Sequence, residues 1–228
     1  MRMIAGLIGP KGCGKDTSAA YLIKEAGFMR AAFADVLYQE AADAFGVTVE
    51  FLGNRDTKET DLPELRLERC RDPEFVKVVL EVLRYSYKRR KEMRAPRSPR
   101  FIMQLWGTEY RRRSRTGWDS YWLDKVQAVI DANPDRSFVI TDVRFNNEGD
   151  FVEKHGGFLV RIRRPELEAR EAADRARRGT AAHSSETEML TRKVAYELFN
   201  VEGKPESLRE GILGAIGHAA SCLTPAAA

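Results

Sequence analysis

Residues 3–21 read MIAGLIGPKGCGKDTSAAY: a short apolar run, a glycine-rich turn that ends in a lysine, and the start of a helix. The spacing from Gly9 through four residues to Gly14 and Lys15 matches the P-loop pattern. The flanks agree, because residues 3–8 suit a buried parallel strand and the chain from Asp16 onward suits a helix. We therefore interpret the stretch as a cradle for nucleotide phosphates. The alternative is a glycine-rich strand-to-helix turn without a ligand.

The residue types of this turn fit phosphate chemistry. Backbone N–H groups can surround a polyphosphate only where side chains leave room, which glycine provides, and the following helix N-terminus adds partial positive charge. The lysine supplies a charge for the β- and γ-phosphates. Asp16 stands where Ser or Thr is usual and Thr17 follows, so Mg²⁺ is expected on Asp16 directly, on Asp16 through a water, or on Thr17. The predicted ATP-binding residues are Gly9, Lys11, Gly12, Cys13, Gly14, Lys15, Asp16 and Thr17.

Composition narrows the class of protein. The 228 residues are 43% hydrophobic and 32% charged, which is typical of a globular protein with a sizeable core. Three scattered cysteines without metal-ligand spacing indicate reduced thiols. The sequence has no apolar run of membrane-spanning length and no signal-peptide pattern at its start, so we expect a cytoplasmic protein without a membrane partner.

Positive charge is concentrated in residues 84–115. This block holds twelve Lys or Arg and two Glu, a net charge of +10, whereas the rest of the chain carries −6. Of the 38 basic residues 27 are Arg, whose planar fork suits bidentate phosphate contacts. The block could bind nucleic acid or a small phosphorylated substrate, or it could be a solvated face.

Predicted strands and helices alternate along most of the chain, which favours a parallel, doubly wound α/β sheet. Strands are predicted over residues 3–8, 28–33, 138–140, 158–162 and 194–201, and helices over residues 16–25, 35–45, 75–93, 120–132, 148–155 and 206–217, with one more beginning at Pro99. Residues 46–73 are predicted to be loop-like.

The strand over residues 138–140 delivers Asp142 and Arg144 at its carboxyl end. Ligands of open α/β sheets bind outside the carboxyl ends of the strands, so both side chains are expected to face the P-loop crevice. The arginine-rich segment 163–178 follows another core strand, where a lid would be inserted. Its acidic residues are interleaved with the arginines, so an exposed, ion-paired helix is the alternative.

Four stretches together resemble one family, the deoxynucleoside monophosphate kinases typical of tailed bacteriophages. The stretches are GPKGCGKDT (9–17), PRFIMQLWGTEYRR (99–112), TDVRFNNE (141–148) and HSSE (183–186). The resemblance implies a three-layer P-loop kinase fold with a parallel doubly wound sheet, a helical region for the nucleoside monophosphate and an Arg-rich lid. As one domain spanning 1–228, it would have its core in 1–45, 134–162 and 190–220, its helical insertion in 46–132 and its lid in 163–189.

The activity that the resemblance implies is transfer of the γ-phosphate of Mg·ATP to a deoxynucleoside 5′-monophosphate. Lys15, Arg100 and Arg144 would be the catalytic residues, and Asp16 and Thr17 would serve the metal. The implied monophosphate site consists of Arg100, Gln104, Gly107, Thr108, Trp122, Asp142, Arg144 and Glu148.

Several points remain open within that reading. Gln104 stands where some relatives carry a carboxylate, so base preference is not assigned. Trp122 could lie against the deoxynucleoside or simply pack in the core, and Asp142 could hold a Mg²⁺-bound water or cap a core element. His183 is expected to be structural or a lid hinge. Relatives suggest a homodimer. If the gene belongs to a phage, the expected location is the cytoplasm of the host cell.

Two other functions are compatible with parts of the pattern. One is a different P-loop small-molecule kinase, since the sequence GKDT is shared with animal-type phosphomevalonate kinases. The other is a nucleic-acid-binding P-loop ATPase that would use residues 84–115 on a phosphate backbone. We do not expect nucleic acid as a partner, because Arg100 lies inside the implied substrate stretch and no separate aromatic platform for single strands is evident.

Overall fold

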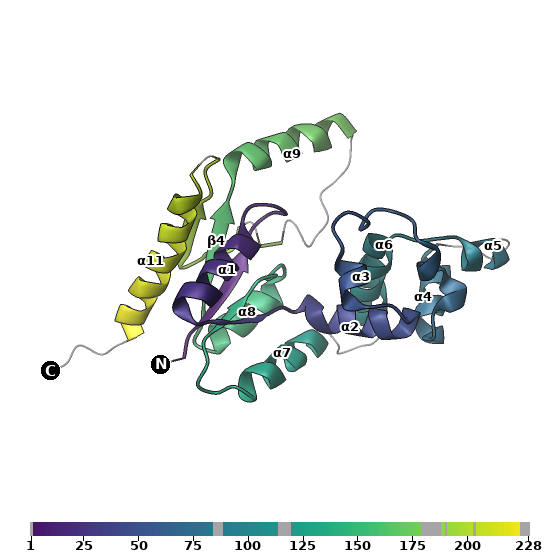
Figure 1. Cartoon of the computed structure of the whole chain (residues 1–228), viewed down its shortest axis with the longest axis horizontal. Coiled ribbons are helices and arrows are strands. Elements are labelled where there is room, and N and C mark those ends of the chain that lie inside the picture. Colours follow the sequence, from purple (N-terminus) through teal and green to yellow (C-terminus); the bar gives the residue numbers. More distant parts are fainter. Residues whose placement is uncertain are drawn as a thin grey trace. The chain divides into compact units, whose positions relative to one another are not determined.

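The structure is a computed structural model of the chain and describes residues 2–83, 89–113, 120–178, 188–189, 191–202 and 204–223 (Figure 1). The chain divides into two compact units. The first unit comprises Met1–Ala32 and Val126–Ala228, and the second comprises Phe33–Lys125. HSSE (183–186), with His183, lies outside the described residues, as do parts of the 84–115 block.

The first unit is built on a five-stranded sheet in the order β2-β3-β1-β4-β5. Every adjacent pair of these strands is parallel, which confirms the predicted doubly wound α/β fold. The strands are β1 (Ile4–Ile8), β2 (Met29–Ala31), β3 (Phe138–Ile140), β4 (Phe158–Arg163) and β5 (Tyr196–Phe199). The helices of this unit are α1 (Lys15–Ala26), α8 (Asn146–Lys154), α9 (Pro165–Arg178) and α11 (Pro205–Leu223), and α7 (Tyr121–Asp131) crosses the boundary between the units.

Apolar side chains from both faces of the sheet form the core of the first unit. Ala5 and Leu7 of β1 share a buried cluster with Leu22 of α1 and Ile212 of α11, and these two helices lie side by side (Figure 1). Gly6 faces the opposite side, where an added Cβ would meet side chains of β4 and α8. Because β1 is the middle strand and is buried throughout, the turn that follows it has a fixed base.

The second unit is helical. Its elements are α2 (Ala34–Phe45), α3 (Val49–Gly53), η1 (Pro63–Leu65), η2 (Leu67–Arg69), α4 (Pro73–Val82), α5 (Arg89–Arg94), α6 (Pro99–Gln104) and the π-helical segment η3 (Leu105–Arg113). Its core contains an aromatic group in which the ring of Phe75 lies 4.4 Å from that of Trp106 and 5.6 Å from that of Tyr110. As predicted, a helix begins at Pro99, and the Ser98 hydroxyl accepts a hydrogen bond from the Phe101 amide at its start.

Two predictions in this unit were wrong. Residues 46–73 are not simply a loop, because α3, η1 and η2 form within them, each only three to five residues long and thus too short to show a helical period. The helix predicted over 75–93 is instead α4, which ends at Val82, and a separate α5 that begins at Arg89. Apolar and then basic residues gave one continuous helical pattern there, although the chain closes α4 with a cap at Leu83.

No helix in the described ranges is both long enough and apolar enough to cross a membrane.

Replacement of Asp72 by alanine should destabilise the second unit. Its Oδ1 accepts the amides of Glu74 and Phe75 at the start of α4, each at 3.0 Å, and its Oδ2 accepts the Tyr110 hydroxyl at 2.7 Å. The loss of a cap and of a hydrogen bond from a buried hydroxyl together costs about 2 kcal/mol. Urea denaturation of Asp72→Ala measures this loss. Thr48→Ala, which removes one exposed cap bond at α3, should cost less, and equal losses in the two variants would contradict the prediction.

Candidate functional site

The P-loop turn leaves β1 in a conformation that only glycine accepts without strain. Gly9 has φ 143° and Gly14 has φ 113°. A Cβ on Gly9 would lie 2.3 Å from the carbonyl oxygen of Ile162, and one on Gly14 would lie 2.7 Å from Nδ2 of Asn200. The loop is therefore pressed against the carboxyl ends of β4 and β5, and its backbone rather than its side chains defines its inner surface.

Lys15 is tied to the loop that it follows. Its Nζ donates to the carbonyl oxygens of Gly9 and Pro10, both at 2.7 Å. Burial lowers the pKa of Lys15, and the positive charge of Arg144 lowers it further. A polyphosphate between them would reverse the electrostatic part of that effect, because an anion favours the charged form of Lys15.

Cys13 and Asn200 fix the loop against the core of the first unit. The Cys13 side chain is fully buried, and burial raises the pKa of its thiol, so Cys13 is a packing residue and not a reactive one. Asn200, directly after β5, donates from Nδ2 to the Cys13 carbonyl at 2.8 Å. Sequence reasoning missed this contact, since 187 residues separate the two partners. Asp16 and Thr17 are exposed in the first turn of α1, where their oxygens suit Mg²⁺.

The chain after β3 presents the other predicted residues of the first unit. Asp142 is half-buried and Arg144 is exposed. Glu148 is buried, and its Oε2 accepts the backbone amides of Arg144 at 2.7 Å and Phe145 at 3.1 Å. The Glu148 carboxylate is thus turned toward its own backbone and shapes the turn that carries Arg144, and contact with a nucleotide stays a prediction for it.

The remaining predicted residues, Arg100, Gln104, Gly107, Thr108 and Trp122, belong to the second unit. Arg100 bonds Glu59 through its Nε and donates its backbone amide to the Lys58 carbonyl at 3.0 Å. Gln104 is exposed, whereas Trp122 retains only 3% of its surface exposed, which favours the packing alternative for it. The combination of these residues with those of the first unit in one monophosphate site remains a prediction.

Comparison with known proteins decides the family. The deoxynucleoside-5′-monophosphate kinase of Escherichia phage T5 is 32% identical over 185 residues, which cover 68% of this chain and 73% of the relative. The chain belongs to the deoxynucleoside monophosphate kinase family. The "Putative deoxynucleotide monophosphate kinase" of Acanthamoeba polyphaga mimivirus is 29% identical over 212 residues, 89% of each chain. No protein-family model matches the sequence.

Solved structures contribute less than the sequence relatives do to the assignment of this chain to its kinase family. The dephospho-CoA kinase of Campylobacter jejuni aligns over 96% of this chain and 97% of its own, at 14% identity and a TM-score of 0.46. That score is too low to carry an argument. The sequence relatives and the P-loop geometry carry the assignment instead.

A carboxylate that the sequence did not single out organises the second unit of this kinase. Oε2 of Glu40 accepts the Trp106 indole N–H at 3.0 Å and the Arg111 Nε–H at 2.7 Å, and Oε1 accepts the Tyr121 hydroxyl. The Arg111 guanidinium also lies 4.4 Å from the ring centre of Tyr110. Glu40 therefore joins α2, η3 and the start of α7 at one point. The bonds span 66 to 81 residues, so no local pattern reveals them.

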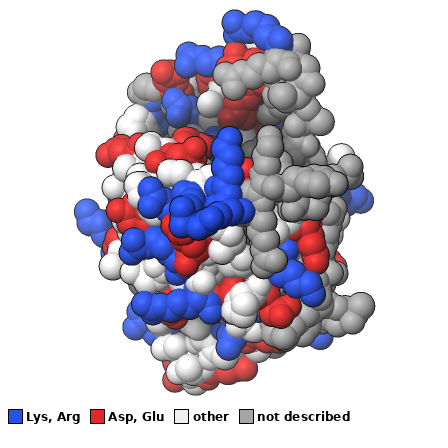
Figure 2. All heavy atoms as spheres, turned by 90° about the vertical axis from the view of Figure 1, so that its right-hand side faces the viewer, with Lys and Arg blue, Asp and Glu red and all other residues white. Residues whose placement is uncertain are grey.

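Four arginines of the basic block of residues 84–115 form ion pairs in the part of the block that the structure describes. Its paired arginines are Arg94 with Glu68, Arg97 with Glu92, Arg100 with Glu59 and Arg111 with Glu40. On the face shown in Figure 2, basic side chains lie interspersed with acidic ones. This arrangement favours the solvated-face and small-substrate interpretations over an open surface for nucleic acid.

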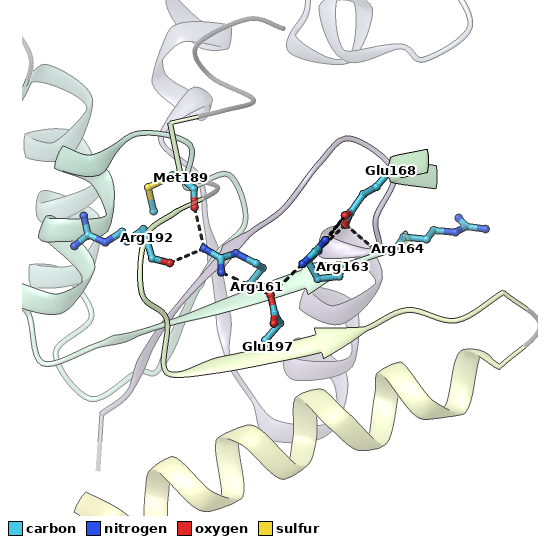
Figure 3. A network of polar contacts seen from close by, with 7 residues as sticks. All are labelled: Arg161, Arg163, Arg164, Glu168, Met189, Arg192 and Glu197. Carbon is cyan, nitrogen blue, oxygen red and sulfur yellow. Dashed lines mark hydrogen bonds and ion pairs between the residues drawn. The ribbon is translucent and has the colours of Figure 1, made fainter. Parts of the chain in front are cut away.

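The predicted lid segment shows the interleaved pairing that was its alternative. Arg163, at the end of β4, makes a bidentate contact with Glu168, through Nε to Oε1 at 2.9 Å and Nη2 to Oε2 at 2.6 Å, and it also lies near Glu197 of β5 (Figure 3). Farther along α9, Arg177 pairs with Asp174 on the exposed surface. The role of this segment as a lid remains a prediction.

Glu40→Gln should loosen the second unit and change the titration of Tyr121. The variant removes the charge opposite Arg111, and hydrogen bonds to charged groups contribute about 1.5–3 kcal/mol, so we expect a loss of about 2 kcal/mol. Burial, the hydrogen bond to Glu40 and its charge together raise the pKa of Tyr121 to about 12. In the variant that pKa should fall but stay above its usual 10.0, because burial remains.

The sign of the pH effect follows from that shift. A raised folded-state pKa stabilises the fold below the unfolded value of 10.0, and the contribution is lost as pH rises toward about 12. Urea denaturation at pH 8 and pH 11, with tyrosinate absorbance, measures both effects. Asp43→Asn, which neutralises a carboxylate that accepts one exposed hydrogen bond from Gln39 on the same helix, is the matched control. An unchanged urea midpoint for Glu40→Gln at pH 8 would show that the bonds to Glu40 contribute nothing.

Proposed function

We propose that this chain transfers the γ-phosphate of Mg·ATP to a deoxynucleoside 5′-monophosphate, giving the diphosphate and ADP. The carrying observation is a P-loop with glycine-only geometry whose carbonyls hold Lys15, next to the strand that Arg144 follows, in a chain of the deoxynucleoside monophosphate kinase family. Phosphoryl transfer demands positioning and charge neutralisation more than covalent chemistry, and this arrangement supplies both.

In this proposal the loop amides and Lys15 bind the ATP phosphates. The helix N-terminus adds favourable potential, and Gly14 at the cap of α1 leaves the first turn open to an anion. Arg144 faces the same phosphates from the β3 side, and Arg100 grips the acceptor phosphate. Mg²⁺, held by Asp16 directly or through water, or by Thr17, would neutralise phosphate charge when bound.

The first test is diphosphate formation with Mg·ATP across a panel of deoxynucleoside and ribonucleoside monophosphates, with DNA as a separate addition. We expect transfer to one or more deoxynucleotides, and the panel would show the base choice that Gln104 leaves open. Transfer to no nucleotide, together with ATP hydrolysis that rises on addition of DNA, would refute the proposal and assign residues 84–115 to a nucleic acid.

Lys15→Ala should abolish turnover. The variant removes the cation that the Gly9 and Pro10 carbonyls hold inside the loop. Steady-state rates at saturating ATP measure the effect, with Lys24→Ala in the exposed last turn of α1 as control. A folded Lys15→Ala protein with the wild-type rate would remove the loop from the active site.

Arg144→Ala should lower the rate of transfer by roughly 10³-fold or more, as expected for one well-placed arginine in phosphoryl transfer. Its side chain is exposed, so the free energy of unfolding should not change. Rates and thermal midpoints measured together separate the two effects, and Arg136→Ala offers an exposed arginine outside the site for comparison. A near-normal rate for Arg144→Ala would exclude this residue from the reaction.

A further inference from the structure

The backbone that carries Arg144 is held at three successive amides. Glu148 Oε2 accepts the N–H groups of Arg144 and Phe145, and Glu188 Oε1 accepts the N–H of Asn146 at 2.8 Å. Glu148 lies on the same turn, but Glu188 comes from a segment 42 residues farther along the chain. A distant piece of chain therefore takes part in fixing this loop.

Arg192, in that same distant segment, adds further hydrogen bonds to the loop after β3. Its Nη1 donates to the Asn146 carbonyl at 3.0 Å, and its Nη2 donates to Asp150 at 2.6 Å and to Glu153 at 2.7 Å. Only 15% of the Arg192 side chain is exposed. The planar guanidinium directs separate N–H groups to a main-chain oxygen and to two carboxylates of α8. Both polar groups of the Asn146 backbone are thus bound, the N–H by Glu188 and the carbonyl by Arg192.

Arg161 of β4 anchors the gripping segment to the sheet. Its Nη2 donates to the carbonyls of Met189 at 2.9 Å and Arg192 at 2.6 Å, as Figure 3 shows. Its side chain is only 14% exposed, and its Nη1 lies 3.6 Å from Glu197 of β5. Because β4 pairs directly with β1, the Arg161 anchor and the P-loop rest on neighbouring strands.

We propose that Arg192, anchored by Arg161, is a positioning residue for phosphoryl transfer: it fixes the loop after β3 so that Arg144 stays directed at the P-loop. The inference rests on the proposed function and extends it to a residue that touches no reacting group. The Arg144 side chain is long and exposed, so the direction in which its guanidinium points depends on the position of its backbone. A misplacement of about 1 Å can cost roughly 10²-fold in rate, so a loosened loop is enough to impair catalysis.

Two variants disturb the grip in different ways. Arg192→Met removes the guanidinium and keeps much of the aliphatic volume. Gly149→Ala keeps Arg192 but places a Cβ 2.9 Å from its Cζ and 3.0 Å from its Nε, which displaces the guanidinium. Arg209→Met is the control, because it removes a comparable paired contact, to Glu25 at the far end of α1 from the P-loop.

The decisive readouts are kcat for a deoxynucleotide, ATP affinity by direct binding, and hydrogen exchange of residues 142–149. We expect both variants to lower kcat roughly 10- to 100-fold, to keep ATP affinity within about twofold since the P-loop contacts remain, and to exchange these amides about tenfold faster. The control should match the wild type in all three. If Arg192→Met does not fold, Gly149→Ala decides the matter.

The outcomes separate the inference from the function on which it rests. Unchanged kcat in the variants, with faster exchange or a lower thermal midpoint, would make Arg192 merely structural and overturn the inference. Wild-type protein that phosphorylates no nucleotide would instead refute the proposed function, and the exchange of residues 142–149 would still show whether Arg192 holds the loop. Unchanged exchange in both folded variants would overturn the inference on its own.

Discussion

The approach of Gly9 to the carbonyl of Ile162 is the constraint on which the first unit depends. No side chain fits between them, because a Cβ there would lie 2.3 Å from the oxygen. The P-loop therefore leaves β1 in direct contact with the end of β4. The same strand carries Arg161, which holds the segment that grips the loop after β3. The P-loop and the Arg161 anchor of the loop after β3 thus rest on adjacent, parallel-paired strands.

Positive charge is handled differently near the P-loop and on the outer surface. Lys15 donates to main-chain carbonyls, which have fixed positions and carry no net charge, and Arg161 donates to two such carbonyls in addition to its contact with Glu197. Arg177, in contrast, pairs with an exposed carboxylate, and such pairs contribute little in high dielectric. Burial lowers the pKa of Lys15, and an anion bound beside this lysine would favour its charged form.

The sequence predicted the sheet well because its signals are local. Short apolar runs between helical patterns gave all five strands within a few residues, and the glycine spacing located the P-loop. Asn200, Arg192 and Glu40 were missed because their partners lie 187, 46 and 66 residues away, respectively. Polar residues of this kind look like ordinary surface positions until the fold supplies the backbone or side chain that they bind. The assembly of the predicted monophosphate site is hidden for the same reason.

The π-helical geometry of η3 bears on the organisation around Glu40. Hydrogen bonds in a π-helix connect residues five apart, and its wider turn brings side chains at i and i+5 closer in direction than an α-helix does. Trp106 and Arg111 have that spacing, and both donate to the same oxygen, Oε2 of Glu40. In an α-helix the two would diverge around the axis by about 140°, at 3.6 residues per turn. The wider π-helical turn has a less favourable backbone geometry than an α-helical turn. The hydrogen bonds that an indole, a guanidinium and a hydroxyl donate to one carboxylate offset that cost. Gly107 and Thr108, which the resemblance assigns to the acceptor, lie within this π-helical segment, so the position of their backbone follows from the bond between Glu40 and η3.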